Sequence, residues 1–197
     1  MGRKVSYSPQ RLRHTVSQRE TFMLFCEGET EVGYFSGFKV RALTIPVGNA
    51  LTFVKKAILR KQQLTKTYTQ YWVVFDKDDT TNADFNTAIR LALQNGFSVA
   101  YSNQAFELWF ILHFRRAQGM MHRNNYEASL QNHLPSYNAN RKGEAQGKQM
   151  FYTLIHLTND AIKNAKADYD AFGNHNNPAA EESSTTVFQL VEKLNKI

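Results

Sequence analysis

Residues 71–79 read YWVVFDKDD, and this stretch decides the fold that the sequence predicts. Its first part is a run of β-branched and aromatic side chains, which is typical of a strand. The run is apolar throughout, as strands are when helices cover both faces of a parallel sheet. It ends at Asp76, and Asp78 and Asp79 follow. We therefore expect 71–76 to be a buried strand of an α/β sheet.

Other segments on both sides of this stretch alternate between strand and helix patterns. Strands are expected within TFMLFCEG (21–28), LTIPV (43–47) and FSVAYS (97–102). Helices are expected at 29–41, 50–63, 82–94 and 106–114, with Thr30 and Asn49 as candidate N-caps and Gly96 just past a helix end. The alternation predicts an α/β fold with a mainly parallel sheet flanked by helices.

The chain divides into three parts by composition. Residues 1–20 carry five basic side chains and one acid, so we expect a flexible basic arm. Residues 21–118 form the expected α/β core. Residues 119–197 form an expected, mainly helical part packed on that core, with helices near 124–134, 149–168 and 185–196 and a polar, mobile loop at 173–184.

The overall composition excludes several classes of protein. The 197 residues are 42% hydrophobic, which is typical of a globular chain, and no apolar run approaches the ~20 residues of a membrane span. No apolar segment follows the basic start, so no secretory signal is expected. Cys26 is the single cysteine, which excludes an internal disulfide framework and favours the cytoplasm. The net charge of +7 favours polyanions such as nucleic acid as partners.

Acidic and hydroxyl side chains follow three of the predicted strands. They are Glu27 and Glu31, Asp76 and Asp78, and Ser102 and Glu107. The carboxyl ends of parallel strands meet at one edge of the sheet, where ligands bind. Carboxylates gathered there repel one another unless a cation lies between them, and Mg²⁺ or Mn²⁺ prefers such oxygen ligands. We therefore expect the acids among these six residues to be candidate metal ligands, with Asp76 and Asp78 on one face of an extended backbone.

Each acid also has a plainer interpretation. A carboxylate just after a strand often caps the next helix, and Glu29, Asp78 and Asp79 could do that. Three strand ends that each carry acids favour a cation site over three separate caps.

Three strings resemble the signature segments of the RloB-like family: CEGETE (26–31), FDKDD (75–79) and SNQAFELW (102–109). The stretch from NNP to STTVFQLVEKL (176–194) is similar to the tail of that family. RloB-like proteins are related to the Toprim domain of topoisomerases, primases and the overcoming-lysogenization-defect nucleases. The resemblance implies a Toprim-like sheet and covers almost all of the chain after the basic arm.

The resemblance also implies an activity, which is metal-dependent cleavage of DNA or of a structured RNA such as tRNA. Glu27 matches the Toprim glutamate, a metal co-ligand or general acid/base, and Asp76 and Asp78 match the metal-binding Asp-x-Asp. Glu31, Ser102 and Glu107 stand in places comparable to further metal ligands of the two-metal nucleases, so the resemblance implies a ligand role for them as well. A lysine commonly neutralises charge at the reacting phosphate; Lys142 and Lys148 are candidates, and Lys148 is the one we choose. The family is associated with phage defence and restriction loci and with a partner ATPase.

The segment 103–107 departs from the family pattern. Relatives commonly have Asn-Pro-x-Phe-Glu there, whereas this chain has Asn-Gln-Ala-Phe-Glu. Without the proline, we expect a looser loop before Glu107.

Two other functions stay open from the sequence. The chain could be a non-catalytic module that binds nucleic acid or the ATPase through a vestigial acidic pocket. It could also be a receiver-like domain in which Asp76 accepts a phosphoryl group, although no lysine soon follows the strand at 97–102. The sequence does not choose between a monomer and a homo-oligomer.

Overall fold

The sheet predicted from the sequence is present. The computed structural model describes residues 20–117, 119 and 121–197, so the expected arm, but for Glu20, lies outside the described residues. Four strands pair in parallel in the order β2-β1-β3-β4. They are β1 (Phe22–Cys26), β2 (Arg41–Thr44), β3 (Gln70–Asp76) and β4 (Ser98–Ser102). The α/β fold class is therefore confirmed, with β3 as a central strand.

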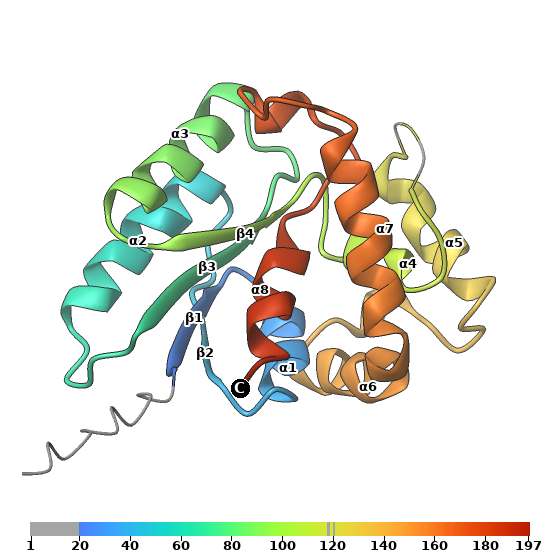
Figure 1. Cartoon of the computed structure of the whole chain (residues 1–197), viewed down its shortest axis with the longest axis horizontal. Coiled ribbons are helices and arrows are strands. Elements are labelled where there is room, and N and C mark those ends of the chain that lie inside the picture. The colour runs from blue at the N-terminus through green and yellow to red at the C-terminus, as the bar shows by residue number, and fades with distance from the viewer. Residues whose placement is uncertain (1–19, 118, 120) are drawn as a thin grey trace, which may run out of the picture.

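Helices cover both faces of this sheet (Figure 1). On one face lie α2 (Ala50–Gln62) and α3 (Asn82–Gln94). On the other face lie α1 (Glu29–Ser36), α4 (Glu107–Leu112), α5 (Tyr126–Gln131), α6 (Glu144–Leu154), α7 (Thr158–Asp170) and α8 (Val187–Leu194). Short 3₁₀ turns occur at 123–125, 139–141, 155–157 and 178–180.

The strand β1 shows how the sequence specifies these two layers. Phe22, Leu24 and Cys26 point to the core under α1 and α4, and Met23 and Phe25 point to the core under α2 and α3. Successive side chains of a strand face opposite ways, so an all-apolar strand supplies both cores at once. Helices α5 to α8, from the C-terminal part of the chain, contribute to the core on the α1 and α4 face.

Helix caps fix the boundaries on the α2 and α3 face. Asn49 Oδ1 accepts hydrogen bonds from the backbone N–H groups of Leu51 and Thr52, which confirms the predicted N-cap. Gly96 follows α3 with a φ of +69°, a conformation that favours glycine. At α1 the prediction was wrong: Gly28 is the N-cap residue, and Thr30 Oγ1 instead accepts a hydrogen bond from the Gly143 N–H at 3.1 Å.

Helices α1 and α6 are in close contact at two glycines. A Cβ on Gly33 would collide with the Glu144 backbone, and one on Gly147 would collide with the Thr30 carbonyl. These glycines therefore let the two helices approach, although glycine weakens a helix signal in sequence. The single helix expected at 149–168 is instead α6, which starts earlier at Glu144, a 3₁₀ turn and α7.

The segment expected as a mobile loop at 173–184 is partly buried. Ala179, Glu181, Ser183 and Ser184 are all buried. The Asn103 side chain donates to the Pro178 carbonyl at 2.9 Å, and backbone hydrogen bonds join Asn103 to residues 183 and 184. These contacts also involve Asn103 in the loop that precedes Glu107; the loosening expected without proline stays a prediction.

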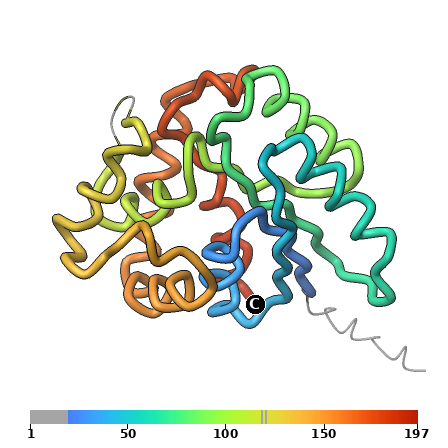
Figure 2. The backbone as a smooth tube through the Cα atoms, turned by 180° about the vertical axis from the view of Figure 1, so that it is seen from behind, coloured from blue at the N-terminus to red at the C-terminus, as the bar shows by residue number. Residues whose placement is uncertain are grey.

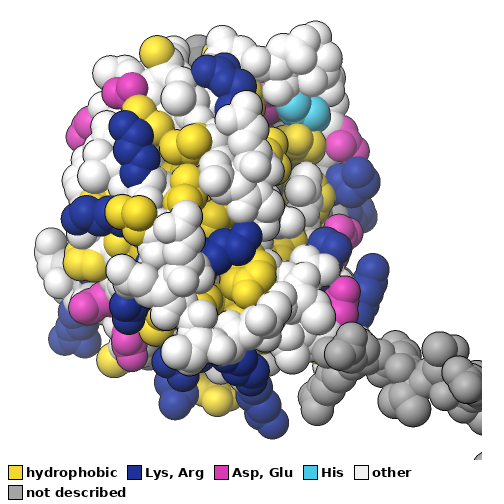
Figure 3. All heavy atoms as spheres, turned by 90° about the vertical axis from the view of Figure 1, so that its left-hand side faces the viewer, with side chains coloured by type: hydrophobic (Ala, Val, Ile, Leu, Met, Phe, Trp, Pro, Cys, Tyr) yellow, Lys and Arg dark blue, Asp and Glu magenta, His cyan; other side chains and the backbone are white. Residues whose placement is uncertain are grey.

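Basic side chains gather on the side of the molecule that includes α2, with acidic side chains among them (Figure 3). Between Glu31 and Asp76 the sequence contains seven lysines and arginines and no acid, which equals the net charge of the chain. Lys55, Lys56 and Arg60 are exposed on α2, and basic side chains are spread over this side in Figure 3. A polyanion partner stays a prediction from the composition.

The C-terminal residue lies near the edge of the sheet at which β1 and β2 begin. The last residue, Ile197, lines a hollow there together with Phe22 and Val40. The C-terminal end is marked C in Figure 2. Among the described helices, none has the length and apolarity that crossing a bilayer requires.

Candidate active site

A cavity of about 340 Å³ opens at the carboxyl edge of the sheet, where the sequence placed its acids. Its acidic lining comes from three places in the chain: Glu27, Glu29 and Glu31 around the start of α1, Asp76 and Asp78 after β3, and Glu107 at the start of α4. Lys142 closes one side. Parallel pairing sets this convergence, because the Glu27 N–H bonds to the Val74 carbonyl and brings the ends of β1 and β3 together.

Asp76 and Glu31 form the buried centre of the cavity. Asp76 ends β3, and its Oδ2 accepts a hydrogen bond from the Phe106 N–H at 3.0 Å. Burial, followed by the charges of Glu31, Asp78 and Glu107, raises its pKa well above the usual range. Glu31 is only 5% exposed, and burial followed by Glu107 and Glu27 raises its pKa to about 7. Lys142 lowers the pKa of Glu31, but burial and the neighbouring carboxylates raise it by more.

Glu27 lies at the more open side of the same cavity. Burial raises its pKa to about 7, a hydrogen bond from the Asp76 backbone partly opposes the rise, and the charge of Asp78 adds to it. A carboxyl with a pKa near neutrality can accept or donate a proton at physiological pH, which is what general acid/base chemistry requires.

Asp78 lines the cavity in a different way from that expected. It lies beyond the end of β3 with a φ of +42°, so it shares a cavity with Asp76 through a turn and not through an extended backbone. Arg123 bridges two acids: Nη1 lies 2.5 Å from Asp78 Oδ1, and Nη2 lies 2.7 Å from Asp79 Oδ2. Burial raises the pKa of Asp78, and Arg123 opposes the rise. Asp79 does not line the cavity.

Glu107 and Lys142 form an ion pair across the cavity. Lys142 Nζ lies 3.3 Å from Glu107 Oε1. Glu107, followed at lower weight by Asp76 and Asp78, raises the pKa of Lys142. Lys142 therefore stays charged and faces the position where several carboxylates meet.

Two residues singled out from the sequence are not brought to this cavity. Ser102 is buried below it, and its hydroxyl lies 3.4 Å from the Thr185 hydroxyl. Lys148 is exposed on α6 and does not line the cavity, whereas the other candidate, Lys142, does. A ligand role for Ser102 and a catalytic role for Lys148 stay predictions without geometric support.

Two residues at the site were missed in the sequence. Gln104 accepts from the Arg123 N–H at 2.7 Å, its carbonyl accepts from the Asp78 N–H at 2.9 Å, and its side chain donates to Glu182. Arg123 reaches Asp78 from a part of the chain 45 residues away. No local pattern marks Arg123, but the replacement of proline by glutamine at 104 was a visible signal.

The donor chemistry of the cavity fits a divalent metal ion. Buried carboxyls whose pKa values rise through burial and mutual repulsion are the oxygen ligands that Mg²⁺ and Mn²⁺ prefer. Within residues 20–117, 119 and 121–197, however, no three His, Cys, Asp or Glu side chains are already arranged around one ion position. Lys142 instead pairs with Glu107, and Arg123 pairs with Asp78.

Comparison with known proteins gives one match. No curated protein and no solved structure matches the chain. The family model described as RloB-like protein matches residues 22–194, from the first residue of β1 to the last of α8. The match includes every acid that lines the cavity, and the chain therefore belongs to the RloB-like family.

Proposed function

We propose that this protein is a metal-dependent nuclease of the Toprim type that hydrolyses phosphodiester bonds in DNA or in a structured RNA such as tRNA. The observation that carries the proposal is the convergence of carboxylates from three separate parts of the chain on one cavity that also holds Lys142. The basic surface on α2 supports it, because nucleic acid binding depends strongly on lysine and arginine contacts to phosphate.

The most buried acids, Asp76 and Glu31, together with Asp78 and Glu107, would hold Mg²⁺ or Mn²⁺. The ion would supply charge neutralisation at the phosphate and activation of water.

The chain's own residues have separate tasks in the reaction. Water adds to phosphorus, the bond from phosphorus to the leaving oxygen breaks, and Glu27 takes the proton that the water loses. Lys142 turns from Glu107 toward the phosphate and offsets the negative charge that develops there. Solvent protonates the leaving oxygen. Gln104 is a positioning residue, because it holds the backbone of Asp78 and Arg123.

The wider setting of the proposal follows from the family. We place the protein in the cytoplasm, in a bacterial anti-phage defence or restriction-linked system, with a partner ATPase. A nuclease controlled by such a partner can be silent alone, so the assay includes the ATPase.

A second function has one observation in its favour. Lys142 and Arg123 already neutralise Glu107, Asp78 and Asp79, as would be expected if the cavity were vestigial and the protein only bound nucleic acid or the ATPase. This alternative predicts binding without any metal-dependent cleavage.

The test is cleavage of supercoiled plasmid and of total tRNA during a titration with Mg²⁺ or Mn²⁺, with and without the co-expressed ATPase. Asp76→Asn and Glu27→Gln should remove cleavage while circular dichroism shows a folded protein. Glu192→Gln changes an exposed acid on α8 that does not line the cavity, and it should cleave like the natural chain. Equal cleavage by all three variants would reject the nuclease.

A further inference from the structure

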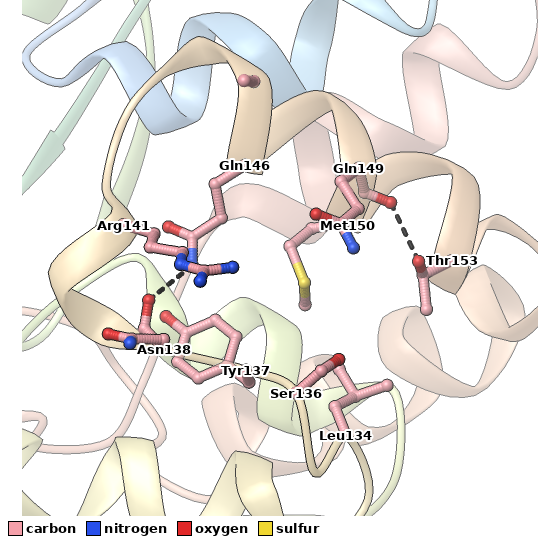
Figure 4. Close-up of a pocket in the computed structure, with 10 residues that line it drawn as sticks. Leu134, Ser136, Tyr137, Asn138, Arg141, Gln146, Gln149, Met150 and Thr153 are labelled. Carbon is pink, nitrogen blue, oxygen red and sulfur yellow. Dashed lines mark hydrogen bonds between the residues drawn. The ribbon is translucent and has the colours of Figure 1, made fainter.

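A second cavity, of about 250 Å³, lies between α6 and the segment 134–141 (Figure 4). It shares no lining residue with the carboxylate cavity. Its volume is slightly below the ~300–1,000 Å³ of sites for drug-sized ligands, so it suits a ligand part about the size of one ring system.

The inner wall of this cavity is apolar and includes an aromatic ring. Met150 and Tyr137 are 5% and 6% exposed, and Leu134 completes the wall. In Figure 4 these three side chains surround the open space between α6 and the loop. A phenol ring with a thioether beside it forms a polarisable surface against which a flat ring packs well.

The rim is polar and carries a positive charge. Gln146 donates its amide N–H to the Asn138 carbonyl at 2.8 Å, which fixes the Gln146 side chain and leaves its oxygen to accept a hydrogen bond. Gln149 is exposed and provides a second amide. No acid lines the cavity, and Arg141 has no ion pair or side-chain hydrogen bond to the residues that the structure describes.

The amides and the arginine together define the ligand chemistry. Two amides can recognise a ring that carries both donors and acceptors at its edge, and a guanidinium can bind a phosphate. A flat, polar ring attached to a phosphate is a nucleotide.

The segment 137–142 connects this cavity to the carboxylate cavity. Arg141 lines the one, and its neighbour Lys142 lines the other. The Tyr137 ring lines the second cavity, and its hydroxyl lies near Glu107 of the carboxylate cavity, whose charge, after burial, raises the pKa of that hydroxyl. A nucleotide chain that places a phosphate beside Lys142 therefore has a base site nearby.

We infer that the cavity between α6 and the segment 134–141 holds one unpaired base of the nucleic acid substrate. The inference rests on the proposed function and narrows its substrate to single-stranded or locally opened nucleic acid, because a base inside a duplex is stacked and cannot enter such a cavity. The phosphate next to that base lies on Arg141.

The inference can be tested in the absence of metal by NMR of the protein labelled at its methionine methyl groups. Met150 reports on the cavity, and Met23, buried on the far side of the sheet, serves as the internal control. Thymidine monophosphate and adenosine monophosphate should shift the Met150 methyl signal through the ring current of the base and leave Met23 unchanged. An unchanged Met150 signal, or the same shift with inorganic phosphate alone, would overturn the inference.

Variants separate the base site from general charge attraction. Arg141→Gln should weaken mononucleotide binding by about 10-fold or more, as loss of a charge-assisted hydrogen bond does. Ala145→Trp places a large ring in the cavity from an exposed position of α6 and should remove the Met150 shift. Lys163→Gln removes an exposed positive charge on α7 and serves as the matched control. Equal weakening by Lys163→Gln and Arg141→Gln would overturn the inference.

Longer ligands distinguish a base of the substrate from a free nucleotide. A single-stranded tetranucleotide should shift Met150 at lower concentration than the mononucleotide, and a blunt duplex should not shift it. If the mononucleotide bound as tightly as the tetranucleotide, the cavity would be a free-nucleotide site and the substrate assignment would be wrong. Base binding and cleavage have separate readouts, so a failure of the proposed nuclease would appear as absent cleavage with an intact Met150 shift. Glu27→Gln should likewise remove cleavage and leave the Met150 titration unchanged.

Discussion

Replacement of Glu31 by glutamine should make the metal-free protein more stable, and only above acidic pH. The folded protein raises the pKa of Glu31 from 4.5 to about 7, so ionisation of this carboxyl opposes folding. Because the pKa of Glu31 is raised in the folded protein, the contribution of this carboxyl to the free energy of unfolding is fully present below pH 4.5. That contribution is lost as the pH rises through the folded value of about 7. A shift of ~2.5 units corresponds to up to about 3 kcal/mol at pH 8 and to less than about 1 kcal/mol at pH 5.

Glu31→Gln keeps the length and an acceptor oxygen of the side chain but cannot ionise. The melting temperature without metal should therefore rise by about 6–12 °C at pH 8 for a chain of this size, with little change at pH 5. The same variant should lose much of the stabilisation that Mg²⁺ or Mn²⁺ gives to the natural chain, because a buried ligand is gone.

The assay is thermal unfolding followed by circular dichroism at pH 5 and pH 8, with EDTA and with Mn²⁺. Glu192→Gln, on the exposed face of α8, should behave like the natural chain at both pH values. A variant that is less stable at pH 8, or a difference that is the same at both pH values, would refute the view that burial and the neighbouring carboxylates oppose ionisation of Glu31 by more than Lys142 favours it.

Three further predictions concern stability. Gln104→Leu leaves the Arg123 N–H and the Glu182 carboxylate without their partner, so urea unfolding should show a free energy of unfolding lower by about 1–3 kcal/mol. An unchanged midpoint would show that Gln104 does not hold Arg123 in place. The pKa of His113 is lowered to about 4 by burial, so the natural chain should lose up to about 3 kcal/mol relative to His113→Phe as the pH falls from 6.5 to 4, and parallel pH curves would contradict this. Gly147→Ala should lower stability by about 1–3 kcal/mol, whereas Gly48→Ala, with open space around it, should not; equal effects would show that α1 and α6 do not need the close contact.

Much of the fold could be predicted from sequence because its signals are local. The apolar run ending at Asp76 indicated a central strand, and the cap at Asn49 marked the start of a helix. The start of helix α6 was missed because Gly147 weakens the local helix signal. Gly147 allows close contact with the Thr30 backbone, and this contact exists only in the folded structure. The burial of Glu181 and of residues 183–186 could not be predicted either, since it depends on hydrogen bonds to a segment some 80 residues away in the chain.

The candidate site divides in the same way. Acids after parallel strands could be placed at one edge by topology alone, so the convergence of Glu27, Asp76 and Glu107 was predictable. The positive charges were not, because Lys142 and Arg123 come from segments whose path to the site depends on how the C-terminal helices pack. For the same reason Lys148 could not be separated from Lys142 by sequence.

The claim on which this account depends is that the carboxylates at the ends of β1 and β3 bind a divalent cation. A crystal structure of the protein soaked in Mn²⁺, with anomalous scattering measured at the manganese edge, tests it most directly. The account predicts an anomalous peak in the cavity, bound by Asp76 and Glu31 at metal–oxygen distances, with Lys142 displaced from Glu107. A cavity without an anomalous peak at saturating Mn²⁺, in which Lys142 still pairs with Glu107 and Arg123 with Asp78, would contradict it.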